Sequence, residues 1–408
     1  MENPKIRFKG FTKDWEQRKL GDVAEFSKGN GYSKGDLIES GTPIILYGRL
    51  YTKYETIISE VDTYVEAKEG SVYSKGGEVI VPASGETAED IARAATVDKS
   101  GILLGGDLNV VMPNKDINPA FLAISISNGN SQRELSKKAQ GKSVVHIHNE
   151  EIRNLVIPFP NKVEQNKIVA YFANLDHLIT LHQRKCEQTK KLKKYMLQKM
   201  FPQNGAKVPE IRFDGFTYDW EQRKLSDVLD IVTKRNGEKY GKEEVLSVSD
   251  EYGCINQIKF QGRSFAGEDI SNYKIVDTGD IIYTRSPLKS KPYGIIKVVG
   301  DEIGIVSPLY IVNKVKEGNN SQFIYRVFDS PEKTNKYLSP LVRKGAKNTM
   351  NISNDEWLSG KIDVAPSYEE QYQIGLYFDH LDHFITLHQR KCDELKKMKK
   401  YMLQNMFI

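Results

Sequence analysis

The chain has 408 residues, with 59 lysine and arginine residues against 54 aspartate and glutamate residues, so its net charge is +5 at pH 7. This length is enough for two or three domains, each with its own core. The sequence has no run of 18 apolar residues and only three scattered cysteines, which excludes a membrane-spanning chain and a disulfide framework. We therefore expect a soluble, cytoplasmic protein that binds polyanions only through local patches, because its overall charge is small.

Residues 1–160 are expected to form a first strand-rich domain that contains short helices. The domain opens with Trp15-Glu16-Gln17-Arg18-Lys19-Leu20. Apolar and β-branched runs predict strands at 43–47, 78–82 and 108–112, and a short helix at 119–127. Basic and aromatic residues alternate in the loops, as in surfaces that contact phosphates and base edges. The candidate DNA contacts of this domain are Lys28, Tyr32, Tyr47, Arg49, Lys138, Lys142 and His146.

A long helix is predicted next, over residues 164–201. Its apolar or small positions recur at alternating steps of four and three, which is the heptad pattern of a coiled-coil seam. Asn161 and Glu164 have the spacing of an N-terminal cap, and Pro202 ends the helix. We assign residues 161–201 to a central helix and residues 202–208 to a linker.

Residues 209–366 are expected to form a second mixed α/β domain. Strands are predicted at 245–248, 281–283, 294–299 and 305–312, with a short helix at 321–329. Basic and aromatic residues again share the loops, although a solvated surface charge is the simpler explanation for any one of them. The candidate DNA contacts here are Lys234, Arg235, Arg263, Tyr283, Arg285, Lys289, Lys344 and Lys347.

The chain closes with a second long helix, predicted over 370–407 within a segment 367–408. Its sequence repeats the first helix: Leu178-Ile179-Thr180-Leu181-His182-Gln183-Arg184-Lys185-Cys186 returns, with Phe384 as its first residue, at an offset of 206 residues. The opening motif of the first domain also returns, as Trp220-Glu221-Gln222-Arg223-Lys224-Leu225. The chain is therefore an internal duplication.

The repeat is uneven, because the domain ends match while the middles, about 26–155 and 231–360, do not visibly align. Drift alone should have eroded the ends as well, so we interpret the middles as two different reading modules on one frame. Helices of about 38 residues span roughly 57 Å at 1.5 Å per residue, too long to bury their seams inside one module. We expect the two helices to pack antiparallel as a coiled coil with pseudo-two-fold symmetry.

Additional apolar positions widen the apolar stripe of each helix beyond a two-helix seam. A wider stripe suggests that helices of partner subunits complete a bundle, although a plain two-helix coiled coil stays a possible interpretation. The candidate partner-binding residues are Tyr171, Leu178, Leu181, Leu192, Tyr195, Tyr377, Leu387 and Tyr401.

Catalytic motifs are missing from the sequence. It has neither the paired acidic and lysine residues of a nuclease nor an Asn/Asp-Pro-Pro-aromatic motif of an amino-methyltransferase. His182 and Cys186, with His388 and Cys392, have zinc-ligand chemistry and would meet at an antiparallel dyad, but we interpret them as seam residues and expect no metal. The chain is therefore expected to recognise a target and not to catalyse a reaction.

The doubled order of these features resembles the specificity subunit of a type I restriction-modification system. The resemblance covers essentially the whole chain. It rests on the Trp15–Leu20 and Trp220–Leu225 motifs and on the module exits, in which Pro160 and Pro366 precede the Glu-Gln pairs at 164–165 and 370–371. Gly279-Asp280-Ile281-Ile282 and Ser307-Pro308 also fit the interior of the family's modules, whereas Gly77-Glu78 and Gly106-Asp107-Leu108 in the first module depart from it.

The resemblance implies an α+β fold of two mixed α/β target-recognition domains joined by two long antiparallel helices. Each domain would read one half of a bipartite, asymmetric double-stranded DNA site, and the helices would set the spacer. Two methyltransferase subunits and two restriction (motor) subunits would be partners, with S-adenosylmethionine, ATP and Mg²⁺ bound by those partners and no cofactor in this chain. The alternative is a coiled-coil protein scaffold without base-specific DNA binding.

Overall fold

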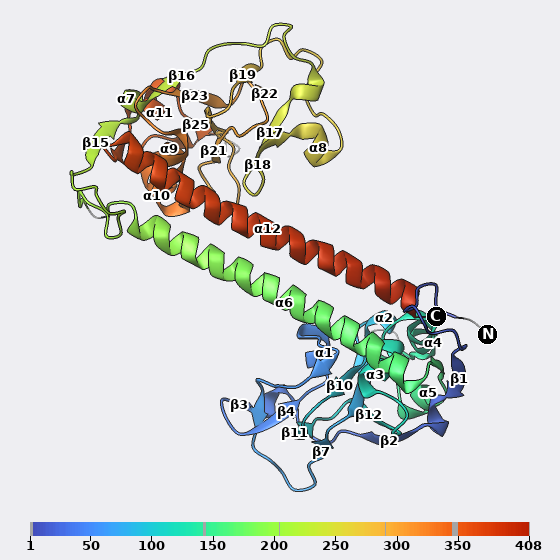
Figure 1. Cartoon of the computed structure of the whole chain (residues 1–408). Helices are drawn as coiled ribbons and strands as arrows, with labels where there is room; N and C mark the ends of the chain where they lie inside the picture. The colour runs from blue at the N-terminus through green and yellow to red at the C-terminus, as the bar shows by residue number, and fades with distance from the viewer. Residues whose placement is uncertain (1–2, 142–143, 204, 290, 345–349, 408) are drawn as a thin grey trace. The chain divides into compact units, whose positions relative to one another are not determined.

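The structure is a computed structural model that describes residues 3–141, 144–203, 205–289, 291–344 and 350–407. Its contacts divide the chain into two compact units. Unit 1 comprises Met1–His182 and Arg390–Ile408, and unit 2 comprises Gln183–Gln389. Each unit therefore contains one strand-rich module and a segment of each long helix, α6 (Lys162–Lys199) and α12 (Tyr368–Met406) (Figure 1).

The module of unit 1 is built on two five-stranded sheets that mix parallel and antiparallel pairs. The first sheet has the order β2(Ala24–Lys28), β12(Leu108–Pro113), β8(Glu78–Pro82), β10(Ala95–Val97), β5(Ile57–Ile58). The second has the order β3(Leu37–Ile38), β6(Tyr64–Val65), β4(Thr42–Ile45), β11(Ser100–Leu104), β7(Tyr73–Lys75). Two further pairs are β1(Glu16–Lys19) with β14(Val156–Phe159), and β9(Ser84–Gly85) with β13(Val145–His146).

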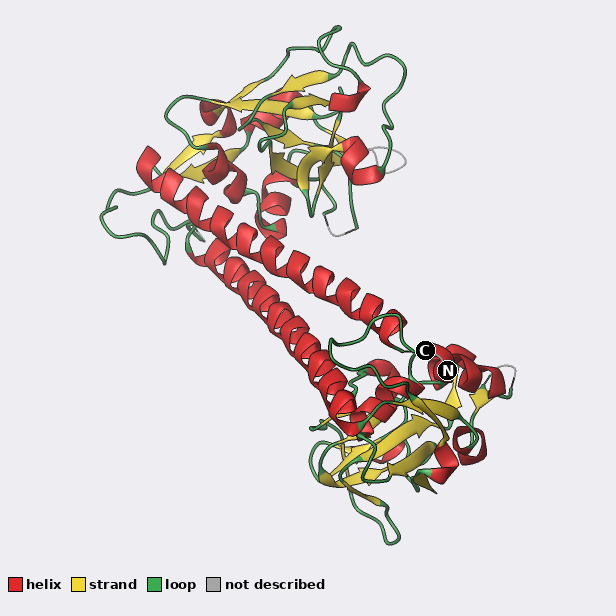
Figure 2. Ribbon diagram, turned by 45° about the vertical axis from the view of Figure 1, so that its right-hand side comes forward, coloured by secondary structure: helices red, strands yellow, loops and turns green. Residues whose placement is uncertain are grey.

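Short helices connect and cover these strands (Figure 2). They are α1(Arg49–Thr52), α2(Ala88–Ile91), α3(Pro119–Ile126), α4(Gly129–Lys138) and α5(Asn149–Arg153), with single 3-10 turns at Leu20–Asp22 and Lys34–Asp36. Helix α3 begins where Asn118 Oδ1 accepts hydrogen bonds from the backbone N–H groups of Ala120 and Phe121. Its buried side chains join the main core of unit 1, where they meet α6 and the end of α12.

The module of unit 2 has a four-stranded sheet and four two-stranded pairs. The sheet has the order β16(Leu229–Ile231), β23(Ile311–Val315), β20(Ile281–Tyr283), β21(Ile296–Val298). The pairs are β15(Glu221–Lys224) with β26(Lys361–Val364), β17(Leu246–Ser249) with β18(Gly253–Asn256), β19(Lys274–Val276) with β22(Gly304–Val306), and β24(Arg343–Lys344) with β25(Met350–Asn351). The helices are α7(Leu225–Val228), α8(Gln257–Gln261), α9(Ser321–Val327), α10(Pro331–Leu338) and α11(Asn354–Ser359), with a 3-10 turn at Lys242–Glu244.

One strand expectation was wrong, because the run 305–312 is two strands, β22 and β23. The chain turns between them at Ser307-Pro308, where proline has no N–H group for a sheet ladder. The two strands belong to different sheets. The predicted strand 78–82 coincides with β8, and 281–283 coincides with β20.

The α6 and α12 segments pack antiparallel in both units. In unit 1, Asp176 pairs with Lys399, and in unit 2, Asp382 pairs with Lys193. These residues are related by the 206-residue offset of the repeat, so the two ion pairs are equivalent. The aromatic cores repeat in the same way: Phe407 lies beside Trp15 and Phe121 in unit 1, and Phe201 lies beside Trp220 and Phe323 in unit 2. The antiparallel packing of the helix segments within each unit and the internal repeat are confirmed.

The segment that precedes each module is fixed to the start of a long helix. Arg7 donates two hydrogen bonds to the buried Glu164 carboxylate, at 2.6 and 2.8 Å, and Arg212 does the same to Glu370, at 2.7 and 2.8 Å. A bidentate guanidinium–carboxylate pair is a strong and directional contact, and it offsets the cost of burying the carboxylate. Within the described ranges, no helix combines the length and apolar character that a membrane span requires.

Candidate nucleic-acid interface

In both modules, a hairpin meets the loop that follows the central strand. In unit 1, the chain leaves β8 and enters β9, which pairs with β13 so that Ser84 lies opposite His146. Ser84 Oγ and His146 Nδ1 are 3.1 Å apart, and the Ile147 N–H donates to the Ala83 carbonyl at 3.1 Å. Gln140 and His146 exchange backbone hydrogen bonds, and we refer to the segment with this bridge and with β13 as the hairpin of unit 1.

Unit 2 joins the same two segments through the side chain of Arg285. The Arg285 guanidinium follows β20 and donates to the carbonyls of Leu309, at 2.7 Å through Nε, and of Ile352, at 3.2 Å through Nη1. Arg285 has φ of 53°, a left-handed conformation that costs energy for a residue with a side chain. The hairpin here is β24–β25, in which Arg343 lies opposite Asn351.

The two hairpins occupy equivalent positions in the chain. Each lies just before a short helix that starts with an asparagine and an acidic residue, Asn149-Glu150 for α5 and Asn354-Asp355 for α11. Each is also tied to the end of the central strand, through Ala83 in unit 1 and Arg285 in unit 2. We define this pair of segments, the hairpin and the loop after the central strand, as the reading edge of each module.

Several predicted contacts lie at or beside the reading edges. His146 and Lys289 are exposed, and Lys138 is half-buried at the end of α4. Tyr47, 38% exposed, meets the ring of Tyr51, whose hydroxyl donates to the Ser84 carbonyl at 2.8 Å. Lys344 lies in β24, but its side chain, and all of Lys142 and Lys347, lie outside the described residues.

Four of the candidate residues have side chains that make contacts within their modules. Arg49, 8% exposed, pairs with Glu55 and Asp62. Tyr283 is fully buried against Trp357 at 4.9 Å between ring centroids, and burial raises the pKa of its phenol. Arg285 ties loops together as described above, and burial lowers its pKa. The Tyr32 hydroxyl forms hydrogen bonds with Ser71 Oγ and with the backbone N–H of Lys68. The backbone of Tyr32 has φ of 60°.

The remaining candidates lie on other loops. Lys28 ends β2 and is exposed. Lys234 and Arg235 are exposed, and the Arg235 guanidinium donates to the Asn272 carbonyl at 3.0 Å. The Arg263 guanidinium stacks over the Phe265 ring at 4.6 Å. No contact described for these residues joins them to a reading edge.

Sequence reasoning missed two participants of the reading edge in unit 1, Ser84 and Gln140. Neither carries charge or an aromatic ring, so a search for basic and aromatic residues passes over them. The repeated Asn-acid start of α5 and α11 would have located the hairpin that precedes each helix.

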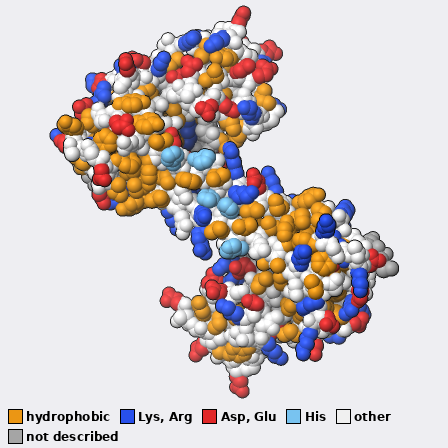
Figure 3. Space-filling view, in the orientation of Figure 1, with side chains coloured by type: hydrophobic (Ala, Val, Ile, Leu, Met, Phe, Trp, Pro, Cys, Tyr) orange, Lys and Arg blue, Asp and Glu red, His pale blue; other side chains and the backbone are white. Residues whose placement is uncertain are grey.

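The predicted partner-binding residues divide into exposed and half-buried groups. The exposed ones, from 39% to 57% exposed, are Leu178, Leu192, Tyr195, Leu387 and Tyr401. Tyr171 and Tyr377 instead pack on the N-terminal segments of their units, against Phe8 and Phe213, and Leu181 is half-buried. Exposed Phe384 and Met398 were missed, although they are the repeat equivalents of Leu178 and Leu192. Figure 3 shows lysine, arginine and histidine side chains over the same two helices.

The cysteines of the helices are seam residues. Cys186 and Cys392 are each 2% exposed, and Cys186 Sγ lies 3.8 Å from the Ile385 carbonyl. Among the described residues, no group of three or more His, Cys, Asp and Glu side chains is placed to hold a metal ion.

Comparison with known proteins decides the family. The family described as type I restriction modification DNA specificity domain matches residues 12–191 and again residues 218–397. The chain belongs to this family. Two specificity subunits of type I restriction enzymes from Methanocaldococcus jannaschii are similar to it: MjaVIII, 24% identical over 96% of this chain and 91% of its own, and MjaX, described as putative, 25% identical over 96% and 92%.

The fold agrees with this assignment. The S subunit of a type I restriction-modification system from M. genitalium superposes with a TM-score of 0.64 at 13% identity, covering 100% of this chain and 99% of that one. The chain is thus a specificity subunit, the DNA-recognition component of a type I restriction-modification complex and not its catalytic component. Its two specificity domains fit a bipartite DNA target.

Proposed function

We propose that each module of this specificity subunit reads one half of a bipartite DNA site with its reading edge. The observation that carries the proposal is that the two units share the same helices and equivalent ion pairs, whereas the contacts of their reading edges differ. In unit 1 the edge is held by a serine–histidine contact, and in unit 2 by a strained arginine. Equivalent edges with different side chains would read different half-sites.

The chemistry of the edges suits this role. Exposed cations such as Lys289 can contact phosphates, whereas amide and imidazole groups such as Gln140 and His146 can meet base edges in the major groove. Arg285 acts as a positioning residue, because its guanidinium is occupied by two backbone carbonyls. Strain of this kind persists only where surrounding contacts impose it, and it fixes the direction in which the loop projects.

Module exchange tests the proposal. Replacing residues 225–360 with the corresponding module of another specificity subunit, and expressing the chain with its methyltransferase partner, should change one half of the methylated sequence. The other half should remain, because unit 1 keeps its own edge. Methylome sequencing reads both halves at once, and a change in both halves would contradict independent reading.

We further propose that two methyltransferase subunits dock on the helices, one per unit. Exposed apolar residues occur at equivalent positions in the two units: Leu178 and Phe384, Leu192 and Met398, Tyr195 and Tyr401. An apolar surface that occurs at equivalent positions in both units suits two copies of one partner. Two restriction subunits would complete the complex, and S-adenosylmethionine, ATP and Mg²⁺ would be bound by the partners.

Stoichiometry of the purified complex tests the docking proposal. Tyr195→Ala should remove one methyltransferase copy, Tyr401→Ala the other, and the double variant both, as measured by native mass spectrometry. Gln188→Ala, at an exposed polar position of α6, is the matched control and should keep both copies. Retention of both copies by the double variant would place the docking surface elsewhere.

A further inference from the structure

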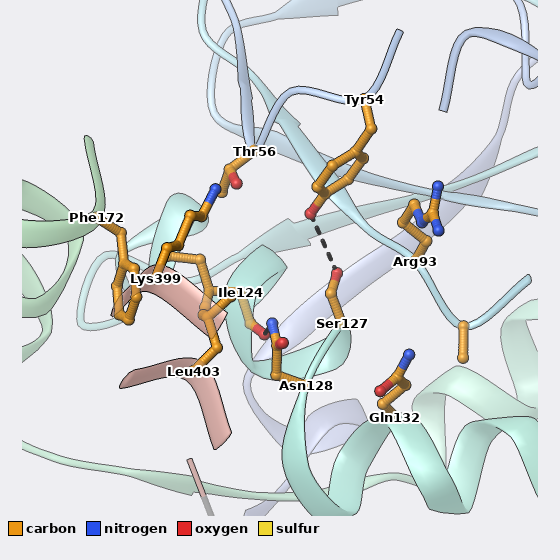
Figure 4. A pocket seen from close by; sticks show the side chains of 11 residues that line it. Tyr54, Thr56, Arg93, Ile124, Ser127, Asn128, Gln132, Phe172, Lys399 and Leu403 are labelled. Carbon is orange, nitrogen blue, oxygen red and sulfur yellow. Dashed lines mark hydrogen bonds between the residues drawn. The ribbon is translucent and has the colours of Figure 1, made fainter. Parts of the chain in front are cut away.

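A pocket in unit 1 lies where the short helices of the module meet the end of α12. It has a volume of about 250 Å³ and is lined by Tyr54, Arg93, Ser127, Asn128 and Lys399, among others. Figure 4 shows Lys399 and Arg93 on opposite sides of it, with the Tyr54 hydroxyl directed toward Ser127 Oγ, 3.5 Å away. A second hollow of about 530 Å³ shares Asn128 and Lys399 and adds further basic side chains, Arg133, Lys396 and Lys400.

The lining of both hollows is basic. Among the described residues that line them, none is acidic. Lys399 is paired with Asp176, and Arg93 lies 3.3 Å from Asp90 and stacks on the Tyr54 ring at 5.2 Å. Lys396 and Lys400 are exposed, and no ion pair is described for either. The two cations of the pocket are thus balanced by carboxylates, and the excess positive charge comes from Arg133, Lys396 and Lys400 of the second hollow.

The equivalent place in unit 2 contains its own carboxylates. The equivalence is set by Asn118 and Asn320, whose backbone N–H groups donate to the side chains of Gln165 and Gln371. Counted from these residues, Ile124 corresponds to Arg326 and Ser127 corresponds to Asp329.

In unit 2, the Arg326 guanidinium donates to Asp329, Asp379 and Asp382 at 2.6–2.7 Å. Lys193, the equivalent of Lys399, pairs with Asp329 and Asp382. Positive charge at this position is thus balanced inside the protein. In unit 1, Ile124, Ser127 and Ala173 replace Arg326, Asp329 and Asp379, so that only the ion pair Asp176–Lys399 of this cluster is kept.

We infer that the pocket of unit 1, together with the hollow beside it, binds a phosphate group, which would be held by Arg133, Lys396 and Lys400, the lining cations for which no ion pair is described. Lysine and arginine are the usual phosphate ligands in proteins. The volume is several times the roughly 30 Å³ occupied by one water molecule in the liquid, so a hydrated phosphate has room. The residues that form the contacts of the reading edge, Ala83, Ser84, Gln140 and His146, do not line either hollow, so the inference goes beyond the proposed function. The phosphate belongs either to a DNA backbone or to a free phosphate compound.

Titration of the full chain with pyrophosphate at constant ionic strength tests the site. Calorimetry should show one site on the wild type and at least tenfold weaker binding in K396Q/K400Q. The matched control is K190Q/K194Q, the same change at the equivalent positions of unit 2, and it should bind as the wild type does. Ser127→Asp adds a carboxylate to the lining of the pocket and should weaken binding at least tenfold, because it repels the phosphate.

The salt dependence of binding to non-specific duplex DNA identifies the source of the phosphate. A slope of log affinity against log salt that is smaller by about 1 or 2 in K396Q/K400Q, whatever its pyrophosphate affinity, identifies the DNA backbone. Weakened pyrophosphate binding with an unchanged slope identifies a free phosphate compound. Equal affinities and equal slopes in the pocket variant and its control would overturn the inference. Discrimination between specific and mismatched duplexes is a separate measurement, so failure of the proposed function would be recognised independently.

Discussion

At the scale of single residues, buried charges distinguish the two units more than their apolar cores do. Arg326 is 2% exposed and lies among three carboxylates, whereas its equivalent in unit 1 is Ile124, 3% exposed. The carboxylates keep the Arg326 pKa raised despite burial, and the cationic neighbours Lys193 and Arg326 lower the pKa of Asp329. Removal of one member of such a cluster leaves the others buried without a counter-charge.

Arg326→Met should therefore destabilise the protein by roughly 3–5 kcal/mol. The measurement is urea unfolding followed by a probe in unit 2. The matched control is Ile124→Met in unit 1, which exchanges apolar side chains of similar volume and should cost less than about 1.5 kcal/mol. Equal losses in both variants would show that the ion cluster contributes no more than packing.

Asp280 gives the protein a pH dependence on the acid side. Burial raises the pKa of this carboxyl to about 6, against about 3.9 in an unfolded chain. Between pH 4 and 6 the folded state therefore binds more protons than the unfolded state, and stability falls as the pH rises through this window. Asp280→Asn keeps an acceptor for the Asp277 N–H group, now 2.9 Å from the carboxylate. Its unfolding free energy should lack this fall, and an identical pH profile for both proteins would contradict the expectation.

At the scale of elements, α6 and α12 run through both units, and each ion pair between them lies within one unit. The ion pairs Asp176–Lys399 and Lys193–Asp382 keep one antiparallel register in both units. An insertion placed between the two pairs on both helices leaves every contact within a unit intact. The helices would then act as a ruler for the spacer of the DNA site, which is a proposal about function and not a property of either unit.

Insertion of one heptad after His182 in α6 and another after Gln389 in α12 should lengthen the recognised spacer. Seven helical residues add about 10.5 Å, which corresponds to about three base pairs at 3.4 Å each. Methylome sequencing should show both half-sites unchanged. Insertion in α6 alone is the control, and it should impair folding because the two ion pairs can no longer share a register.

Sequence periodicity predicted these helices closely, over 164–201 and 370–407 against Lys162–Lys199 and Tyr368–Met406. Long regular elements repeat their pattern many times, so the pattern is reliable. The short strands of the reading edge in unit 1 could not be predicted from periodicity, because two-residue strands such as β9 and β13 have no period to detect. Arg49 and Arg285 look like surface cations in sequence, and only tertiary contacts show that carboxylates and carbonyls enclose them.

At the scale of the whole molecule, each module is entered from the end of a long helix. The Ile211 N–H donates to the carbonyl of Lys199, near the end of α6, at 2.9 Å. The Ile6 N–H donates to the carbonyl of Asn405, near the end of α12, at 3.0 Å. The N-terminal segment thus follows α12 as the segment 202–208 follows α6, although a covalent bond exists in only one case.

A circular permutant follows from this equivalence. Joining residue 408 to residue 4 and opening the chain within residues 203–208 should give a folded protein that reads the same two half-sites in the same orientation. Thermal unfolding and methylome sequencing are the measurements. Opening the chain inside α6, at Lys190, is the control and should destabilise unit 2. An unfolded permutant with a folded parent would show that the natural order of the halves is required.

Unit 1 is formed by two separate segments of the chain, and this sets the order in which the two units can be completed during synthesis. Trp15, Phe121 and Phe172 close their core only around Met406 and Phe407, which are synthesised after the whole of unit 2. Unit 2 is one continuous segment of the chain, so its residues are complete once Gln389 has been synthesised. The module made first is therefore completed after the later one, and a chain cut between Gln389 and Met406 would leave the core of unit 1 open while unit 2 keeps all of its own residues.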